Sequence, residues 1–286
     1  MEIAVIGANG FLGKSIVNFF LKSEHKVTAF SRNPIDDITT WVEFHINKQN
    51  DFTVFKKFAY VFYCAASGVQ RNYKIDKDSI FEINTFFPIR LSDFLNGTET
   101  KIITFGTYFE IGNNSIDKEW SEEEIIFSKN QCIDDYVYSK KLFSYYAFTS
   151  KTVFHFILPT IYGENENKDR LIPYLISNFK KDGIVTVSEG NQVRQYLYID
   201  DLIYILWKSF NKNIDKGVYN MPSAETLQIK KIVKSIYVFS GNNGKIIQSK
   251  NFRDIPILNL RLKGAKVLCD SSYKFLNIEN CLVKYL

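Results

Sequence analysis

The sequence predicts an α/β fold in which a parallel, doubly wound sheet carries helices on both faces and a smaller C-terminal lobe follows. The chain opens on an apolar strand, a glycine-rich turn and an amphipathic helix, within residues 2–22. Apolar strand-like segments then alternate with helical stripes, which is typical of a parallel sheet. With 286 residues, 45% of them hydrophobic, the chain has room for both parts. We expect residues 1–162 to form the first domain and residues 163–286 mainly the second lobe, with part of 190–216 packing back on the first domain.

Composition and charge argue against several classes of function. The net charge of +5 is modest and no Lys/Arg run is typical of a nucleic-acid tail, so we expect no nucleic-acid partner. The four cysteines lie far apart without a CxxC motif, which favours reduced thiols in the cytosol over disulfides or a zinc site. No apolar run approaches membrane-spanning length and no cleavable signal opens the chain. We therefore expect a cytoplasmic protein with no metal and no membrane contact.

The first turn carries the strongest local signal. Gly7, Gly10 and Gly13 form GxxGxxG between the strand at 2–6 and the first helix. Such a turn brings backbone N–H groups and a helix N-terminus against a pyrophosphate, where any Cβ would collide with it. The overlapping "GKS" would need a glycine in place of Ala8 to form a nucleoside triphosphate loop. We therefore expect a dinucleotide cradle, in which the residues between the glycines also contact the cofactor: Asn9, Phe11 and Leu12.

The end of the second strand, at residues 26–30, indicates which dinucleotide binds. Folds that prefer NAD usually place an acidic residue here to hold the ribose 2′-OH. In this chain Ser31 and Arg32 take that place, and a guanidinium can bind a 2′-phosphate bidentately. We predict NADP as the cofactor, with NADPH preferred over NADH. The alternative is that Arg32 is a solvated loop residue and that Asp36 or Asp37 serves NAD.

The later segments continue the alternation. Strands are predicted at 42–46, 60–68 and 101–112, with a long helix at 81–95. An acidic loop then leads to "DDYVYSKK", in which Tyr136 stands one helical turn ahead of Lys140. The same YxxxK spacing recurs at Tyr73/Lys77 and Tyr204/Lys208, so the spacing alone carries no information in a chain with 17 tyrosines. The position of each pair along the chain has to decide between them.

In this order the segments resemble the extended short-chain dehydrogenase/reductases, the NAD(P)-dependent nucleotide-sugar epimerase/dehydratase family, over nearly the whole chain. Thr107, five residues before Gly112, stands where that family has its catalytic Ser/Thr. Only Tyr136 follows this strand end, so the resemblance implies Thr107, Tyr136 and Lys140 as the catalytic set on a Rossmann-type fold. It further implies cofactor contacts along the first domain: Asp51 and Phe52 at the adenine, Ala65 and Ala66 beside the cofactor, Asn84 on the long helix, Pro159, and again Tyr136 and Lys140.

The chemistry of the predicted set fits a redox step on an oxygen-bearing carbon. Moving a hydride to or from that carbon leaves a proton to be moved on the same oxygen. A tyrosine titrates near pH 10, and a lysine ammonium one turn away favours its phenolate. Thr107 would hydrogen-bond the reacting oxygen and orient it. The alternative is that Thr107 is an ordinary strand-end hydroxyl.

The distal half resembles the substrate-binding part of the same family. Arg194, in "GNQVRQYLYIDDL", matches an arginine that contacts the substrate pyrophosphate, and Arg261 a second phosphate arginine. Tyr108 and Thr160 would also line the substrate site. The alternative for Arg194 is an exposed structural arginine. The family further implies a homodimer, in which the apolar helices at 79–96 and 134–149 pair with their copies.

Departures from the family pattern narrow the expected reaction. Tyr108 and Phe109 stand where the 4,6-dehydratases carry an Asp-Glu pair, so dehydration is disfavoured. Thr160 and Ile157 replace residues of the epimerase-type sugar contact. The remaining expectation is an oxidoreductase similar in character to the 4-ketoreductases, which uses NADPH to reduce the C4 ketone of a CDP- or dTDP-linked 4-keto-deoxysugar for surface polysaccharide synthesis. Two alternatives stay open: a nucleotide-sugar 4-epimerase with bound NAD, and a non-catalytic NADP(H)-sensing or scaffold protein.

Overall fold

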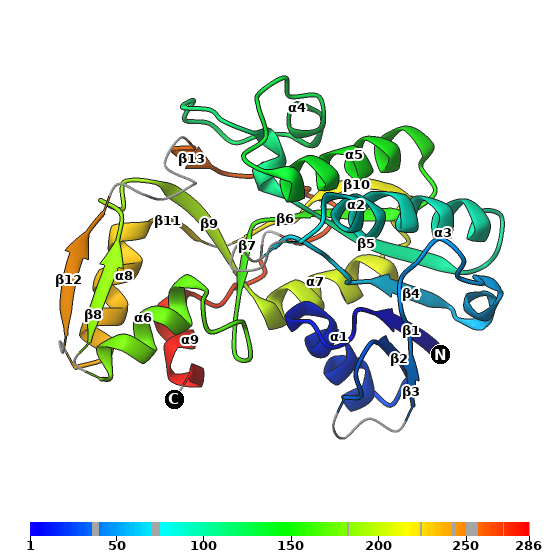
Figure 1. Ribbon diagram of the computed structural model, residues 1–286, viewed down its shortest axis with the longest axis horizontal. Helices are drawn as coiled ribbons and strands as arrows, with labels where there is room; N and C mark the ends of the chain where they lie inside the picture. Colours follow the sequence, from blue (N-terminus) through cyan, green and yellow to red (C-terminus); the bar gives the residue numbers. More distant parts are fainter. Residues whose placement is uncertain are drawn as a thin grey trace.

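A seven-stranded parallel sheet forms the centre of the computed structural model (Figure 1). The structure describes residues 1–35, 40–69, 75–181, 183–223, 225–241, 244–249, 257–270 and 272–285. The strands lie in the order β10-β6-β5-β4-β1-β2-β3, and every neighbouring pair is parallel. They are β1 (Glu2–Ile6), β2 (Lys26–Ser31), β3 (Trp41–Glu43), β4 (Tyr60–Tyr63), β5 (Lys101–Thr107), β6 (Phe154–Leu158) and β10 (Gly217–Asn220). The predicted Rossmann-type, doubly wound sheet is confirmed. Its strand order reverses between β1 and β4, which puts a ligand crevice at their carboxyl ends.

Helices cover both faces of this sheet. α1 (Phe11–Lys22) and α7 (Ile199–Asn211) pack against each other on one face, while α2 (Lys77–Phe81), α3 (Phe87–Leu95) and α5 (Asp135–Ser150) lie on the other (Figure 1). The alternation of side chains along β1 follows from the period of two in a strand. Ile3 and Val5 belong to the hydrophobic core that includes α1 and α7, and Ala4 and Ile6 to the core that includes α3 and α5.

Four predicted elements differ from what the structure shows, and two of them, the strands expected at 42–46 and 60–68, are shorter and cover Trp41–Glu43 and Tyr60–Tyr63. The helix expected at 81–95 is broken by a π-helical turn over Glu82–Phe86, and α3 begins after it with Pro88 in its first turn. Proline has no N–H to donate back along a helix, which accounts for a change of helical register at this point. The strand expected to continue to 112 ends at Thr107, where a 3₁₀ turn over Tyr108–Ile111 begins.

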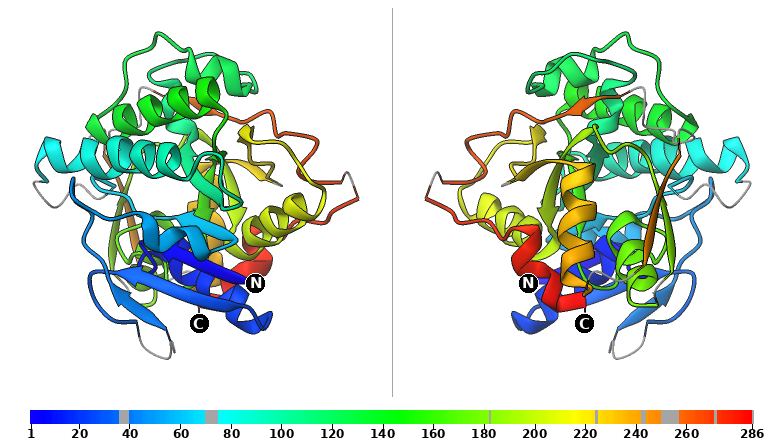
Figure 2. Two further views of the ribbon diagram at one scale, coloured as in Figure 1. Left: turned by 90° about the vertical axis from the view of Figure 1, so that its right-hand side faces the viewer. Right: turned by 90° about the vertical axis from the view of Figure 1, so that its left-hand side faces the viewer.

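The C-terminal part builds two smaller sheets. β9 (Val193–Tyr198) pairs with β7 (Thr160–Tyr162), β11 (Glu225–Gln228) and β13 (Asn259–Leu260), and β8 (Ile184–Val187) pairs with β12 (Lys245–Gln248). The helices of the later chain are α4 (Glu122–Ile126), α6 (Leu171–Phe179), α8 (Ile229–Phe239) and α9 (Ile278–Cys281). α6 and α8 pack against each other in the C-terminal lobe (Figure 2).

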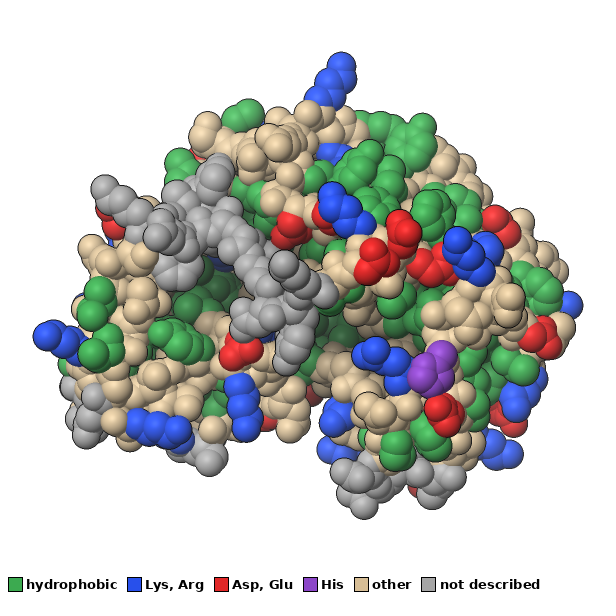
Figure 3. Space-filling view, viewed as in Figure 1, with side chains coloured by type: hydrophobic (Ala, Val, Ile, Leu, Met, Phe, Trp, Pro, Cys, Tyr) green, Lys and Arg blue, Asp and Glu red, His purple; other side chains and the backbone are tan. Residues whose placement is uncertain are grey.

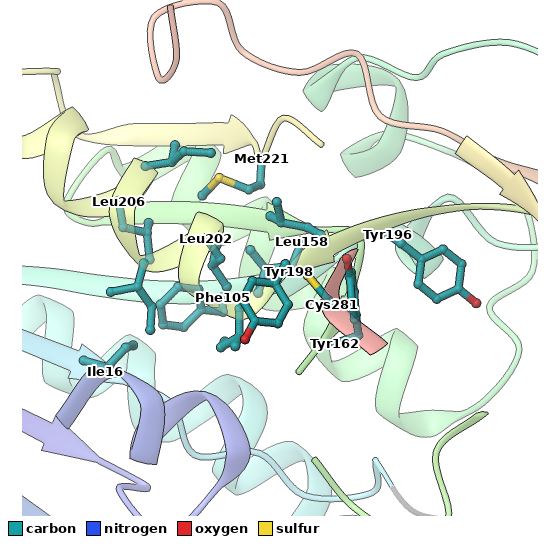
Figure 4. Packing of buried hydrophobic residues seen from close by; sticks show 14 of the residues in the cluster. Ile16, Phe105, Leu158, Tyr162, Tyr196, Tyr198, Leu202, Leu206, Met221 and Cys281 are labelled. Carbon is teal, nitrogen blue, oxygen red and sulfur yellow. The ribbon is translucent and has the colours of Figure 1, made fainter. Parts of the chain in front are cut away.

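One hydrophobic core runs from the central sheet into the C-terminal lobe. It joins Ile16 of α1 and Leu202 of α7 to Tyr162, Tyr198 and Cys281 (Figure 4). α7 and β10 come from the later half of the chain but pack on the central sheet or extend it. The predicted return of part of 190–216 to the first domain stays a prediction. The division at residue 162 stays a prediction, because the shared core crosses it.

Three further observations concern the described part of the chain. There, no helix combines the length and the apolarity that a membrane crossing requires. No group of three or more His, Cys, Asp or Glu side chains is arranged to hold a metal ion among these residues. All four cysteines carry free thiols, and they are Cys64, Cys132, Cys269 and Cys281.

Candidate active site

The glycine turn between β1 and α1 has the close backbone packing that only glycine allows. A Cβ on Gly7 would lie 2.5 Å from the Ala65 nitrogen, and Gly7 has a φ of +80°, in the left-handed region. A Cβ on Gly13 would lie 2.3 Å from the Gly7 oxygen. Asn9 Nδ2 donates to the Asn33 oxygen over 2.7 Å, which ties the turn to the end of β2. This cradle, which a Cβ would fill, lies at the start of α1 and fits the pyrophosphate of a dinucleotide.

The remaining residues of the turn complete the cradle. Gly10 donates its N–H to the Gly7 oxygen over 3.0 Å, which closes the turn. Phe11 and Leu12 form the first residues of α1 and are partly buried. The Phe11 ring lies 3.4 Å from the place that a Cβ on Gly163 would take. The cradle therefore borders the segment that follows β7.

The end of β2 holds the two residues predicted to select the cofactor. Ser31 is buried, donates its hydroxyl to the Asn33 oxygen over 2.7 Å, and accepts from Trp41 Nε1 over 2.9 Å. Arg32 follows it and is exposed. In this structure the Ser31 hydroxyl holds the strand end together, and Arg32 is the side chain at the surface. Asp36 and Asp37, the alternative acidic residues, lie outside the described residues.

The residues predicted to flank the adenine and the nicotinamide follow β3 and β4. Asp51 accepts hydrogen bonds from the Thr53 hydroxyl and N–H, and these bonds lower the pKa of its carboxyl. The Phe52 ring packs edge-on against Phe87 at 5.3 Å between ring centroids. Ala65 and Ala66 come directly after β4 and Cys64, at the carboxyl edge of the sheet, and Ala65 contacts the glycine turn.

Asn84 joins the loop after β4 to α5. Its Oδ1 accepts the Ser67 N–H over 2.9 Å, and its Nδ2 donates to the Ser67 oxygen over 2.8 Å and to the Ser139 hydroxyl over 2.9 Å. The Asn84 side chain is 1% exposed. Asn84 belongs to the π-helical turn that interrupts the predicted helix, so its hydrogen bonds to Ser67 and Ser139 come from that turn. Because Ser139 lies between Tyr136 and Lys140, Asn84 helps to fix both of them relative to β4.

Two members of the predicted catalytic set, Thr107 and Lys140, lie at the carboxyl end of β5. Lys140 is 7% exposed and donates from Nζ to the Phe105 oxygen over 3.0 Å, two residues before Thr107. Tyr136 precedes it by one turn on α5 and faces the loop after β4, where a Cβ on Gly68 would lie 3.3 Å from the Tyr136 Cβ. Burial lowers the pKa of Lys140 to about 8, and the negative charge of Glu110 acts against this shift.

One of the two other YxxxK pairs lies on the opposite face of the sheet, whereas Lys77 of the other pair lies 3.1 Å from Asp135, at the start of α5. Tyr204 and Lys208 are on α7, where Tyr204 is 40% exposed and Lys208 Nζ lies 5.5 Å from the centre of its ring. Lys77 is the first residue of α2, and Tyr73 lies outside the described residues. The position of Tyr204 and Lys208 on α7 separates that pair from Tyr136 and Lys140 on α5, and the choice of Tyr136 and Lys140 as the catalytic pair stays a prediction.

Sequence reasoning missed Glu110, which comes three residues after Thr107. Glu110 accepts the Thr107 N–H over 2.7 Å while the Thr107 hydroxyl accepts the Phe109 N–H, so the two residues form a capping box. The signal was present as a threonine followed by a glutamate at the capping-box spacing. The capping box was not predicted because the whole segment was predicted to form one continuous strand. His155 is fully buried beside Glu110 and Ser144.

The residues predicted to bind the substrate lie beyond the end of β5. The Tyr108 hydroxyl and Thr160 Oγ1 are 2.6 Å apart, next to the buried Pro159. Arg194 is 2% exposed, and its guanidinium donates to the Ile257 oxygen over 2.8 Å. It is therefore not the exposed arginine that the structural alternative requires, and its role at a pyrophosphate stays a prediction.

Arg261 lies on the same side and forms an ion pair with Asp117. Its side chain is 28% exposed, so a phosphate could approach it from solvent. The surface is hollowed between the C-terminal lobe and the central sheet (Figure 3). The phosphate role of Arg261 also stays a prediction.

The chain is similar in sequence to CDP-abequose synthases over most of its length. A CDP-abequose synthase of Salmonella muenchen is 22% identical to the chain over 259 residues, which make up 86% of this chain and 83% of that protein. A CDP-abequose synthase of Yersinia pseudotuberculosis is 22% identical over 253 residues, covering 85% of this chain and 86% of that protein.

Solved structures share the fold. A UDP-glucuronic acid 4-epimerase from Bacillus cereus, solved with UDP-glucuronic acid and NAD, superimposes with a TM-score of 0.85 at 20% identity, covering 99% of this chain and 97% of that one. MoeE5, solved with UDP-glucuronic acid and NAD, superimposes with a TM-score of 0.84 at 17% identity, covering 100% and 97%. A family profile described as "NAD dependent epimerase/dehydratase family" matches residues 3–221. The predicted resemblance is confirmed, and the chain belongs to the NAD dependent epimerase/dehydratase family.

Proposed function

We propose that this protein is a cytoplasmic, NADPH-dependent reductase of the C4 ketone of a nucleotide-diphosphate-linked 4-keto-deoxysugar, acting in surface polysaccharide synthesis. The observation that carries the proposal is the convergence of Lys140 and Thr107 at the carboxyl end of β5, with Tyr136 one turn away on α5 and the glycine turn beside β4. The curated relatives are CDP-abequose synthases, which supports a CDP-linked sugar before a dTDP-linked one.

Thr107, Tyr136 and Lys140 each have a separate role in the proposed reduction. The bound nicotinamide supplies the hydride. Tyr136 donates its phenolic proton to the carbonyl oxygen as that oxygen becomes negative, and the Lys140 ammonium stabilises the phenolate that remains. Thr107 donates a hydrogen bond to the same oxygen and holds it in line with Tyr136. The buried position of Lys140 strengthens this stabilisation, because little water screens its charge.

The neighbours of Thr107 argue against elimination of water. Tyr108 is 1% exposed, and its hydroxyl is paired with Thr160, while Phe109 has no group that can accept a proton. Neither position carries a carboxyl group of the kind that acid/base elimination of water uses, and we propose Tyr136 as the acid for the carbonyl. A 4-epimerase with bound NAD remains the second candidate, supported by the shared fold of the Bacillus cereus 4-epimerase.

NADPH is proposed as the reductant because of the end of β2. Ser31 is buried in contacts with Asn33 and Trp41, and Arg32 is the exposed cation beside it. Asn9 joins the glycine turn to Asn33, which keeps Arg32 close to the cradle. A guanidinium here attracts a 2′-phosphate.

The test is one assay with a panel of substrates. CDP-, dTDP-, UDP- and GDP-linked 4-keto-6-deoxysugars are offered with NADPH, with NADH in parallel, and oxidation of the reduced cofactor is followed by absorbance. We expect NADPH to be consumed with a CDP- or dTDP-linked ketone, with a lower KM than for NADH, and NMR of the product to give its configuration at C4. Protein that copurifies with NAD and interconverts a 4-hydroxy sugar without added cofactor would instead be an epimerase. A lower KM for NADH would refute the NADP preference.

We also propose a homodimer built on α3 and α5. Large apolar side chains stay exposed on these helices and on the segments that adjoin them: Phe86, Phe94, Phe127, Tyr138, Leu142 and Tyr145. Light scattering at micromolar concentration should give twice the chain mass of 33.3 kDa. The Tyr145→Glu variant should shift it towards one chain, and the Val238→Glu variant, on α8, should not. A monomer mass for the unchanged protein would contradict the dimer.

A further inference from the structure

A buried polar cluster lies directly behind Thr107. Gly106 lies within β5 of the central sheet. A Cβ on Gly106 would lie 2.7 Å from Glu110 Oε1, 2.7 Å from His155 Nε2 and 3.1 Å from Ser144 Oγ. Glycine weakens the interior of a strand, and it often marks a place where other groups approach the backbone closely. The missing side chain of Gly106 therefore makes room for three polar groups, which come from the turn after β5, from β6 and from α5.

Glu110 is the acidic member of this cluster. It is 0% exposed, and Oε1 accepts the Thr107 N–H over 2.7 Å. Oε2 is also buried, and no described residue hydrogen-bonds it. A carboxylate in such a place is costly unless a cation lies nearby. Lys140 meets this need, since its Nζ is bonded to the oxygen of Phe105, the residue before Gly106.

The other titratable groups described around Glu110 and Lys140 do not supply the negative charge that Glu110 supplies. His155 bonds Thr104 through Nδ1 and Ser144 through Nε2, and burial together with the Lys140 charge lowers its pKa to about 3, so it stays neutral. Burial raises the pKa values of Cys64 and Cys132, so both remain thiols. Lys141 is a second cation, and its ammonium donates to the Ser128 oxygen. Among these described groups, Glu110 is thus the one whose negative charge raises the pKa of Lys140.

We propose that Glu110 is a positioning residue of this site, which fixes the Thr107 backbone through its hydrogen bond and keeps Lys140 an ammonium through its negative charge. This inference rests on the proposed function for its effect on turnover, but not for its effect on Lys140. Burial raises the pKa of Glu110 to about 7, while Ser144, the Thr107 N–H, Lys140 and Lys141 hold it down, and the pKa of Lys140 is about 8. The two groups therefore titrate in the same range of pH as a coupled pair.

The experiment follows Lys140 itself, without any substrate. Protein labelled with [ε-13C]lysine is titrated by NMR, and the Lys140 signal is assigned by its loss in the Lys140→Met variant. In the unchanged protein the signal should show two inflections, one from each member of the pair. In the Glu110→Gln variant, which keeps an acceptor for the Thr107 N–H, the midpoint should fall by about 1 pH unit or more. Glu124→Gln is the matched control, because Glu124 has the same capping-box position on Ser121 at an exposed site.

Turnover gives the second readout. Glutamine mimics the protonated carboxyl, so kcat of Glu110→Gln should match the unchanged enzyme near pH 6 and fall about 10-fold below it near pH 8, with KM little changed. An unshifted Lys140 midpoint in Glu110→Gln overturns the inference. If that variant does not fold, a single inflection in the unchanged protein overturns it instead. A shifted midpoint in an enzyme that reduces no 4-keto sugar would refute the proposed function alone.

Discussion

Replacing Tyr136 with phenylalanine should lower kcat for ketone reduction by about 10²- to 10⁴-fold, the range that general acid catalysis contributes. The substitution removes one hydroxyl from a helix that is otherwise fixed by Asn84 through Ser139 and by Lys140 through Phe105. The glycine turn is built from other residues, so the dissociation constant for NADPH should stay within about twofold of its original value. Stopped-flow turnover and fluorescence titration with NADPH measure the two quantities separately.

The control for this variant is present in the same chain. Tyr204 has a lysine at the same spacing, stacks on Tyr273 with 5.1 Å between ring centroids, and belongs to α7 on the opposite face of the sheet. Tyr204→Phe also removes one hydroxyl from a helix, and its kcat should equal that of the unchanged enzyme. Normal turnover in Tyr136→Phe would show that another group supplies the proton. Loss of turnover in both variants would show that the effect of Tyr136→Phe is not specific to the site.

The parts of the site that the sequence predicts are those fixed by local geometry. The spacing of the glycines in a turn between a strand and a helix is typical of dinucleotide binding. The carboxyl ends of parallel strands lie at one edge of the sheet. Thr107 and Lys140 meet there because β5 ends at that edge and α5 crosses it. The chain order of a strand end followed by a YxxxK helix is the reason for predicting Tyr136 and Lys140, rather than either of the other two pairs, as the catalytic pair.

The parts that the sequence does not predict depend on partners far along the chain. Glu110 reads as part of a strand until Ser144 and His155, which come 34 and 45 positions later, are placed around Gly106. The hydrogen bond that the Ser31 hydroxyl accepts from Trp41 Nε1 was likewise not predicted. Arg194 is predicted to contact the substrate pyrophosphate, and the hydrogen bond from its buried guanidinium to the Ile257 oxygen was not predicted. In each case the polar group finds its partner through the tertiary fold, and hydrophobic periodicity does not encode that partner.

Replacing Gly13 with alanine should have the second large effect. Helix propensity predicts that alanine stabilises α1, whereas packing predicts that alanine destabilises the glycine turn. Gly13 lies in the first turn of α1, and alanine would be favoured there by about 1 kcal/mol if propensity decided. The structure indicates the reverse, because the new Cβ would lie 2.3 Å from the Gly7 oxygen and 2.9 Å from the Ala8 Cα. Both are backbone atoms of the turn itself, so α1 or the turn would have to move.

The Gly13→Ala variant should therefore bind NADPH roughly 100-fold more weakly, as overpacking by about 3 kcal/mol implies, and unfold at a lower temperature. Gly217→Ala is the matched control, since a Cβ on Gly217 in β10 would meet only the Tyr219 ring, at 3.9 Å. That variant should keep both the affinity and the melting temperature of the unchanged protein. Fluorescence titration and thermal unfolding measure the two effects. An unchanged affinity in Gly13→Ala would mean that the dinucleotide is not held by the backbone of this turn, because a cradle that tolerates a Cβ at 2.3 Å has no fixed shape to offer a pyrophosphate.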